Sequence, residues 1–366
     1  MLTAQTPEAS YFNCLDYSRT QLKRFKGQSF YCPACHDRLR LKIGATVQPH
    51  FAHLPGATCH VAAEGETAEH LAGKALLGKL FRRWQINFAY EVYLASIQQR
   101  PDLLISKGAQ RIAIEFQCSP ISLARLRART EGYRRIGYRV VWILGQRYQR
   151  QQWPASNHAF LQYSVTRGWY QWQLAVNSGQ LWLLHHIAHH GYPQQVSYQR
   201  CLVTQKHLVP STHMRLTTTV LLKENQRLNW QLGQAAPELR PLQQACYLAG
   251  HHLAGAPLCC HQTCMPPLNR QATLLLAVRL LLFCEQQGQV TVTQLQHFCW
   301  ENRLAFYPLP LVDEHFWYVQ WCGVLLKQWQ RQNIVVRQGQ VWFYLGACWY
   351  VDYYSKKNRI QAGSLK

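Results

Sequence analysis

The sequence predicts a mixed α/β protein in three parts. Residues 67–144 are expected to form one helix, three strands, a second helix and a fourth strand, the order of a compact α/β unit. Before this unit, residues 32–59 gather Cys and His among few apolar residues. After it, residues 271–288 and 317–332 have helical patterns. We therefore expect a zinc-knuckle-like N-terminal module over residues 1–63, an α/β domain over 64–153 and a mostly α-helical C-terminal domain over 154–366.

The N-terminal module carries the pattern of a metal site. "CPAC" is a C-x2-C knuckle, and more Cys and His follow within thirty residues. Thiolates and imidazoles at such spacing bind Zn²⁺ tetrahedrally, and a metal would stabilise a segment whose own core is thin. We predict structural Zn²⁺ held by Cys32, Cys35, His53 and Cys59, with His50 as a reserve ligand. The alternative is a loop with free cysteines.

The elements of the α/β domain follow from their apolar spacing. Residues 67–84 have the pattern of an amphipathic helix, and residues 88–97 are rich in aromatic and β-branched residues, as strands are. "RPDLLI" and "RIAIEFQ" predict a hairpin around the polar loop "SKGAQ". Residues 121–137 predict a basic helix ended by Gly137, and residues 138–144 a buried strand.

Two carboxylates stand among the apolar residues of this hairpin. If Ile105 faces Ile112, Asp102 lies opposite Glu115, with Cβ atoms about 4.5–5.5 Å apart. Facing carboxylates repel unless one is protonated or a cation lies between them. Mg²⁺ prefers oxygen ligands, binds through one or two carboxylates and can activate an attacking water. Glu91, on the preceding strand, could be a further ligand.

A simpler interpretation of these acids remains open. Asp102 and Glu115 could merely pair with Arg100 and Arg111 at a sheet edge.

The arrangement of the acids resembles a known superfamily. A helix with Glu69, a strand with Glu91, Pro101-Asp102, and then Glu115-x-Gln117 is similar to the layout of PD-(D/E)XK nucleases. The motifs "CPAC", "HFAH", "ETAEH…GK", "RPDLLI…IEFQCSPIS" and "GYRRIGYRVVWILG", over residues 25–150, further resemble the competence protein CoiA family. This resemblance implies a restriction-endonuclease-like core and a role in natural transformation, with incoming single-stranded DNA as the substrate.

One position departs from the wider superfamily. Gln117 stands where most of those nucleases have Lys, although E-x-Q agrees with the CoiA resemblance. An amide can orient a water or a phosphate oxygen, but it supplies no positive charge to the transition state. The departure puts catalytic activity in doubt without excluding it.

The basic helix supplies candidate DNA contacts. Arginine suits phosphate binding because its guanidinium is a planar fork of donors; the candidates are Arg125, Arg127, Arg129 and Arg134. Tyr133 joins them by resemblance to nucleases with a Gln-x-x-x-Tyr element, although Arg129 occupies the Gln position. His70 and Lys74 share a helix face, where they could touch substrate or support Glu69. The alternative for all of these residues is a solvated surface.

Charge favours a polyanionic partner over the whole chain. The 366 residues include 39 Lys and Arg against 17 Asp and Glu, a formal net charge of +22. The sequence has no phosphate-binding or dinucleotide-binding glycine motif, so ATP or NAD chemistry has no support. We expect a cytoplasmic protein without membrane insertion, with its 14 cysteines reduced or bound to metal.

Two further clusters have weaker patterns. "HHIAHH" (185–190) has His pairs four residues apart that could bind zinc, but we expect ordinary histidines on a helix surface. "CCHQTC" (259–264) is better explained as a loop with buried thiols.

These patterns together predict a DNA nuclease that depends on Mg²⁺ or Mn²⁺. Asp102 and Glu115 would hold the ion, Gln117 would position water, and Glu69 or Glu91 would complete the metal shell. The first alternative is a non-catalytic DNA-binding or recombination adaptor, for which Gln117 is the best argument. A structural zinc protein that binds partners through its Trp-rich C-terminal half is a more distant one. DNA is the expected partner, with recombination or competence proteins beside it; the oligomeric state is not predicted.

Overall fold

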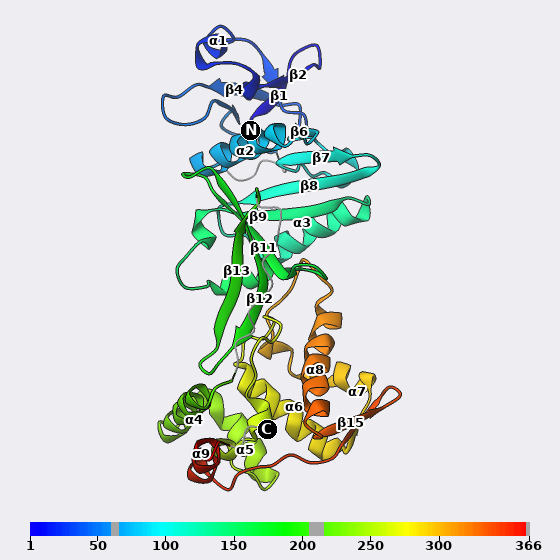
Figure 1. Cartoon of the computed structure of the whole chain (residues 1–366). Coiled ribbons are helices and arrows are strands. Elements are labelled where there is room, and N and C mark those ends of the chain that lie inside the picture. Colours follow the sequence, from blue (N-terminus) through cyan, green and yellow to red (C-terminus); the bar gives the residue numbers. More distant parts are fainter. Residues whose placement is uncertain (60–65, 205–215, 364–366) are drawn as a thin grey trace. The chain divides into compact units, whose positions relative to one another are not determined.

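The computed structural model describes residues 1–59, 66–204 and 216–363 and divides them into two compact units (Figure 1). One unit holds Met1–Phe160, Gln171–Leu184 and the segment that begins at Arg200. The other holds Leu161–Tyr170, His185–Gln199 and the described residues from 216 onward. Within the described ranges, no helix combines the length and the apolar character that crossing a membrane requires.

The N-terminal module is a small antiparallel sheet with an aromatic core. The sheet has the order β2-β1-β3-β4-β5. Phe30 packs against Phe12 and Phe51, with ring centroids 4.9 and 4.8 Å apart, and few other large side chains are buried here. The elements are β1 (Thr3–Gln5), β2 (Tyr11–Asn13), α1 (Arg19–Lys23), β3 (Phe30–Tyr31), β4 (Arg38–Lys42) and β5 (His50–His53).

The α/β domain follows the predicted order of elements. Thr67 begins the first helix, because its hydroxyl accepts the backbone N–H of His70. The hairpin has the predicted register, with Ile105 opposite Ile112, and Gly108 provides the left-handed backbone that the turn needs. The elements are α2 (Ala68–Arg83), β6 (Phe88–Tyr90), β7 (Leu103–Lys107), β8 (Gln110–Gln117), α3 (Leu123–Arg135) and β9 (Arg139–Leu144).

One predicted strand is shorter than expected. Residues 88–97 were expected to be extended throughout, but the strand ends at Tyr90 because Glu91 has a positive φ of 50°. Residues 95–97 form a turn of 3₁₀ helix instead.

The two helices cover opposite faces of the sheet. Side chains alternate along a strand, so Glu115 and Phe116 on β8 point to different faces. Phe116 packs against α2, so closely that a Cβ on Gly73 would lie 1.9 Å from its ring. Glu115 accepts hydrogen bonds from Arg129 and Tyr133 on α3. The end of β8 therefore presents side chains to both layers of the domain.

The expectation of a mostly helical segment from residue 154 is wrong for residues 162–202. This segment forms β10 (Gln162–Ser164), β11 (Gly168–Ala175), β12 (Gln180–His190) and β13 (Gln195–Leu202), in a sheet of order β13-β12-β11-β9-β8-β7-β6, with β10 beside β11. The "HHIAHH" histidines lie on strand β12, not on a helix surface, and His185, His189 and His190 are buried. Histidines four residues apart also share one face of a strand, so their spacing did not decide between the two structures.

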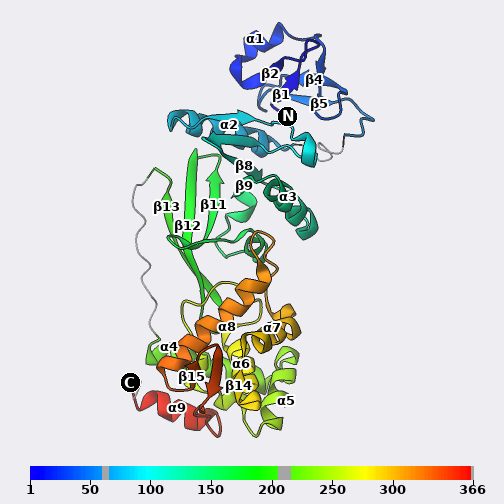
Figure 2. The same cartoon turned by 90° about the vertical axis from the view of Figure 1, so that its right-hand side faces the viewer.

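The described residues from 216 onward are mainly helical, as predicted (Figure 2). The apolar helix α6 and the Trp-rich helix α8 coincide with the predicted helical patterns, and Trp321 and Trp329 of α8 are fully buried. The helices are α4 (Thr218–Gly233), α5 (Arg240–Leu248), α6 (Thr273–Gln287), α7 (Val292–Glu301), α8 (Glu314–Arg331) and α9 (Tyr353–Gln361). A small sheet of order β14-β16-β15 accompanies them, from β14 (Gln289–Val290), β15 (Val335–Gln338) and β16 (Val341–Tyr344).

Candidate functional site

The predicted zinc ligands lie together in the N-terminal module. One ligand atom from each of Cys32, Cys35, His53 and Cys59 lies within 4.8 Å of the other three. The Cys35 Sγ to His53 Nε2 distance is 3.4 Å, and the Cys32 Sγ to Cys59 Sγ distance is 4.0 Å. Thiolates around tetrahedral Zn²⁺ are about 3.8 Å apart, given Zn–S bonds of about 2.3 Å. Three thiols and one imidazole therefore fit a structural zinc ion.

His50, the reserve ligand, stands outside this cluster. Its Nδ1 lies 2.9 Å from the carbonyl oxygen of Gln48, and its side chain faces a cleft instead. Within the described parts of the chain, this is the only group of three or more His, Cys, Asp or Glu side chains close enough to hold a metal ion.

The cleft, of about 380 Å³, lies in the first unit between the N-terminal module and the α/β domain. The module contributes Lys42, His50 and His53 to its lining. The α/β domain contributes three of the predicted catalytic residues and three arginines: Asp102, Glu115, Gln117, Arg100, Arg125 and Arg129. Side chains from two separately folded parts of the chain therefore share one site.

Asp102 is held rigidly as an ionised group. It stands directly before β7, which begins at Leu103, and its Oδ2 accepts the backbone N–H of Phe116 at 2.8 Å. The same oxygen lies 3.0 Å from His70 Nε2, and Lys74 Nζ lies 3.8 Å from Oδ1. Burial disfavours the charged form, but His70, Lys74 and the Phe116 N–H outweigh it and lower the pKa of Asp102.

The pKa of Glu115 is shifted in the opposite direction from that of Asp102. Its Oε1 accepts hydrogen bonds from Arg129 and Tyr133, yet burial and the charge of nearby Asp102 raise its pKa above the usual range. Two acids of one cleft thus differ in how readily they ionise. A divalent cation close to Glu115 would favour its ionised form.

Gln117 contributes an acceptor to the cleft. Its Nε2 donates to the Ser119 carbonyl oxygen at 2.7 Å, which fixes the amide and leaves Oε1 as an acceptor. The side chain is half-buried and lines the same cleft as Asp102 and Glu115.

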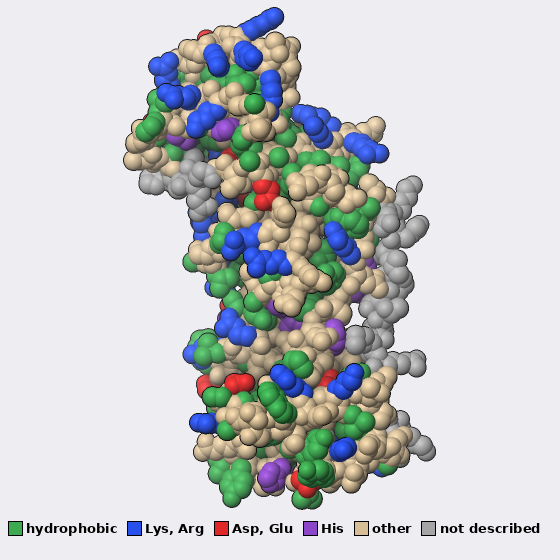
Figure 3. Space-filling model, turned by 90° about the vertical axis from the view of Figure 1, so that its left-hand side faces the viewer, with side chains coloured by type: hydrophobic (Ala, Val, Ile, Leu, Met, Phe, Trp, Pro, Cys, Tyr) green, Lys and Arg blue, Asp and Glu red, His purple; other side chains and the backbone are tan. Residues whose placement is uncertain are grey.

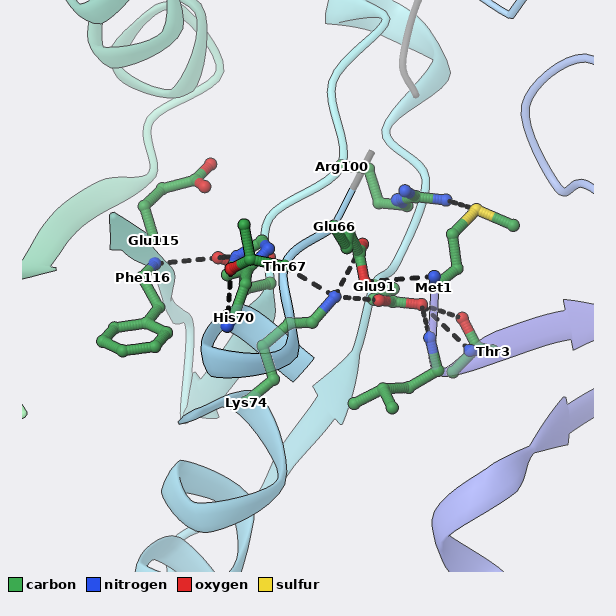
Figure 4. A network of polar contacts seen from close by, with 12 residues as sticks. Met1, Thr3, Glu66, Thr67, His70, Lys74, Glu91, Arg100, Glu115 and Phe116 are labelled. Carbon is green, nitrogen blue, oxygen red and sulfur yellow. Dashed lines mark hydrogen bonds and ion pairs between the residues drawn. The ribbon is translucent and has the colours of Figure 1, made fainter. Parts of the chain in front are cut away.

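Glu91 does not contribute to this cleft. It is 1% exposed and bonded to Lys74, and its Oε2 accepts the backbone N–H groups of Leu2 and Thr3 at 2.8 and 2.9 Å (Figure 4). Lys74 also donates to Glu66 at 2.8 Å. Glu91 therefore docks the N-terminal strand onto the α/β domain, and the prediction that it holds a catalytic metal is not supported.

Four other predicted site residues are placed differently from expectation. Glu69 does not line the cleft, because its Oε1 accepts the backbone N–H of Gln146 at 2.7 Å. Lys74 and Tyr133 are completely buried, so neither has a surface for DNA. Arg129 lines the cleft, but one of its nitrogens is paired with Glu115.

The other predicted DNA contacts on α3 are Arg125, Arg127 and Arg134. Arg125 lines the cleft, and Arg127 and Arg134 are exposed.

Sequence reasoning underrated His70 and the Lys74 network. His70 bonds the carboxylate of Asp102 from the adjacent helix, and the only signal for this role was its position one turn from Lys74. The contacts of Lys74 with Glu91, and of Glu91 with residues 2 and 3, join distant parts of the chain and leave no local pattern.

Comparison with known proteins assigns both parts that line the cleft. A model of the competence protein CoiA N-terminal domain matches residues 14–62, and a model of the CoiA nuclease-like domain matches residues 66–219. The chain belongs to the competence protein CoiA family. Competence protein CoiA of Bacillus subtilis (strain 168) is 34% identical over 153 residues, which are 42% of this chain and 39% of that protein. The chain thus matches well under half the length of this CoiA relative, and no solved structure matches it.

The CoiA match clarifies the cleft. The N-terminal and nuclease-like CoiA domains contribute its two sides, with Lys42 and His50 in the first range and Asp102 and Glu115 in the second. The zinc ligands all fall in the CoiA N-terminal range.

Proposed function

We propose that this protein is a divalent-metal-dependent nuclease that cleaves incoming single-stranded DNA during natural transformation, built on a PD-(D/E)XK core. The observation that carries the proposal is the cleft, which collects Asp102, Glu115 and Gln117 from the ends of β7 and β8. The CoiA nuclease-like match and the name of the Bacillus relative support it.

The side chains of the cleft divide the reaction among them. Asp102 and Glu115 would hold Mg²⁺ or Mn²⁺, which when bound activates the attacking water and neutralises charge on the phosphate. Gln117 Oε1 accepts a hydrogen from that water and orients it toward phosphorus. The Arg129 side chain lines the cleft and is 26% exposed, so its guanidinium would bring positive charge close to a phosphate bound there.

His70 acts as a positioning residue in this scheme. It bonds Oδ2 of Asp102 and so fixes the orientation of that carboxylate. Partners of this kind orient the ligands of metal sites and tune their charge.

A non-catalytic DNA-binding adaptor is the second candidate. Arg129 pairs with Glu115 and Tyr133 donates a hydrogen bond to it, so this carboxylate has partners within the protein without a metal ion. Gln117 brings no positive charge to the reacting phosphate.

One experiment separates these candidates. Purified protein is incubated with labelled single- and double-stranded DNA in Mg²⁺, Mn²⁺ or EDTA. The nuclease gives cut single strands that disappear with EDTA and with Asp102→Ala or Glu115→Ala. Asp16→Ala, an exposed acid of the N-terminal module, is the matched control and should cleave normally. A mobility shift without cleavage in any metal would refute the nuclease and favour the adaptor.

A further inference from the structure

Strand β4 carries a row of positively charged side chains on its exposed face. In "RLRLK", Leu39 is buried and Leu41 half-buried against the aromatic core, whereas Arg38, Arg40 and Lys42 are exposed. Alternate residues of a strand point to one face and lie about 6.8 Å apart. We call these three residues the β4 cation row. Lys and Arg side chains gather on one face of the N-terminal module in the space-filling view (Figure 3).

The side chains of the β4 cation row do not stabilise the described parts of the protein through ion pairs or hydrogen bonds. None of its three cations forms an ion pair or a side-chain hydrogen bond among the described residues. The cations of α2 and α3 that face inward are instead paired, Lys74 with Glu66 and Glu91, and Arg129 with Glu115. Three like charges on one face of a strand repel one another weakly in solvent, and an anion bound across them would relieve that repulsion.

The row ends at the cleft that Asp102 and Glu115 line. Lys42 lies opposite His50 in the β4–β5 ladder, and both line the cleft that holds Asp102 and Glu115. On the far side of the cleft, Arg125 of α3 continues the positive lining.

We propose that the β4 cation row is a binding track for the phosphate backbone of single-stranded DNA and leads it into the cleft at Lys42. This deepens the proposed function and rests on it for the identity of the polyanion. The N-terminal module is then half of the substrate site, and a zinc ion held by His53 would fix strand β5, which pairs with β4. A repeating anion suits this row better than a single anionic ligand, because the charges are spaced along a line rather than converging on one point.

The salt dependence of DNA binding tests this track. Each phosphate contact on a single strand contributes about 0.7 to the slope of log Kobs against log salt. Binding of fluorescent oligothymidine is measured by anisotropy in the Asp102→Asn background, which stops cleavage. The triple variant Arg38→Gln, Arg40→Gln, Lys42→Gln should make this negative slope shallower by about 2 and should weaken binding at low salt.

A matched control removes the same charge from the same module. Lys23, Arg24 and Lys26 are also exposed cations of the module, and none of them lines the cleft. The triple variant Lys23→Gln, Arg24→Gln, Lys26→Gln should keep the parent slope. Zinc content and circular dichroism of both triple variants should equal those of the parent, because no ligand or buried side chain is changed.

The outcomes separate this inference from the proposed function. An unchanged slope in the β4 variant, or an equal fall in both triple variants, would overturn the track. The nuclease proposal is judged independently, by cleavage in the wild-type protein with Mn²⁺. A slope change confined to the β4 variant would support the track even if no cleavage were found.

Discussion

Replacing Lys74 with Met should destabilise the α/β domain by about 3–5 kcal/mol at pH 7.5, the cost of removing one partner from a buried ion pair. Lys74 is completely buried, and its ammonium group donates to Glu91 and, at 2.8 Å, to Glu66. Met fills a similar volume, so the loss comes from charge rather than from a cavity. It leaves the carboxylate of Glu91, which is 1% exposed, without its cation.

The loss of stability caused by Lys74→Met should become smaller as the pH falls. In the wild type, the pKa of Glu91 is far below its ordinary value of 4.5; burial opposes this, but Lys74 and the Met1 amino group outweigh it. An acid with a depressed pKa stabilises the fold above its unfolded pKa and loses that contribution as pH falls through the folded pKa. Without Lys74, the pKa of Glu91 should rise, because the largest charge that lowers it is gone and the burial remains. Protonation of Glu91 then removes the unpaired buried charge, so Lys74→Met should lose less free energy of unfolding at pH 5 than at pH 7.5.

Native-state hydrogen exchange of peptides from α2 and β8 measures this domain without signals from the rest of the chain. The matched control is Lys79→Met, an exposed lysine on the same helix, which should change stability by less than about 0.5 kcal/mol. The double variant Lys74→Met, Glu91→Gln should be less destabilised than Lys74→Met alone, because no buried charge is left unpaired there. Equal protection in Lys74→Met and Lys79→Met at pH 7.5 would refute the reasoning.

Three further outcomes follow from the geometry. Cys32→Ser should lower the zinc content measured by elemental analysis from about one ion per chain to near zero, whereas Cys348→Ser, at an exposed cysteine, should keep it. Gly73→Ala should destabilise the α/β domain by about 1–3 kcal/mol in urea unfolding, because its Cβ would lie 1.9 Å from the Phe116 ring. As the control, Gly323→Ala on α8 has open space around its Cβ and should stabilise that helix by about 0.5–1 kcal/mol. Tyr133→Phe removes a donor to Glu115, which should raise the pKa of Glu115 further and shift the acidic limb of the pH–cleavage profile upward; an unmoved limb would contradict the role of Glu115.

Local pattern was enough to predict the scaffold of the site. The helix at residues 68–83 and the hairpin register at Ile105 and Ile112 depend on apolar spacing and turn residues that lie within a few positions of each other. The spacing of Cys and His also predicted the cluster of Cys32, Cys35, His53 and Cys59, whose ligand atoms lie together in the structure.

The roles of individual acids could not be predicted in the same way. Glu91 follows a strand and Asp102 precedes one, both among apolar residues, and nothing near them in sequence distinguishes an acid that docks the N-terminal strand from one that lines the cleft. The difference comes from Leu2 and Thr3, which are more than 80 residues from Glu91 in sequence and donate to its carboxylate. The prediction of a helix at residues 185–190 was wrong for a different reason. Their histidine spacing fits one face of a helix and one face of a strand equally well.

The buried ammonium of Lys74 connects docking of the module to the chemistry of the cleft. On one side it pairs with Glu91, which binds the first residues of the N-terminal strand, and with Glu66, which also lies 3.1 Å from the Met1 amino group. On the other side it lies 3.8 Å from Asp102 and helps to keep that acid ionised. An error in docking would therefore withdraw Lys42 and His50 from the cleft and also alter the charges around Asp102. The two CoiA domains depend on one cation, so neither wall of the cleft can be understood from its own sequence segment.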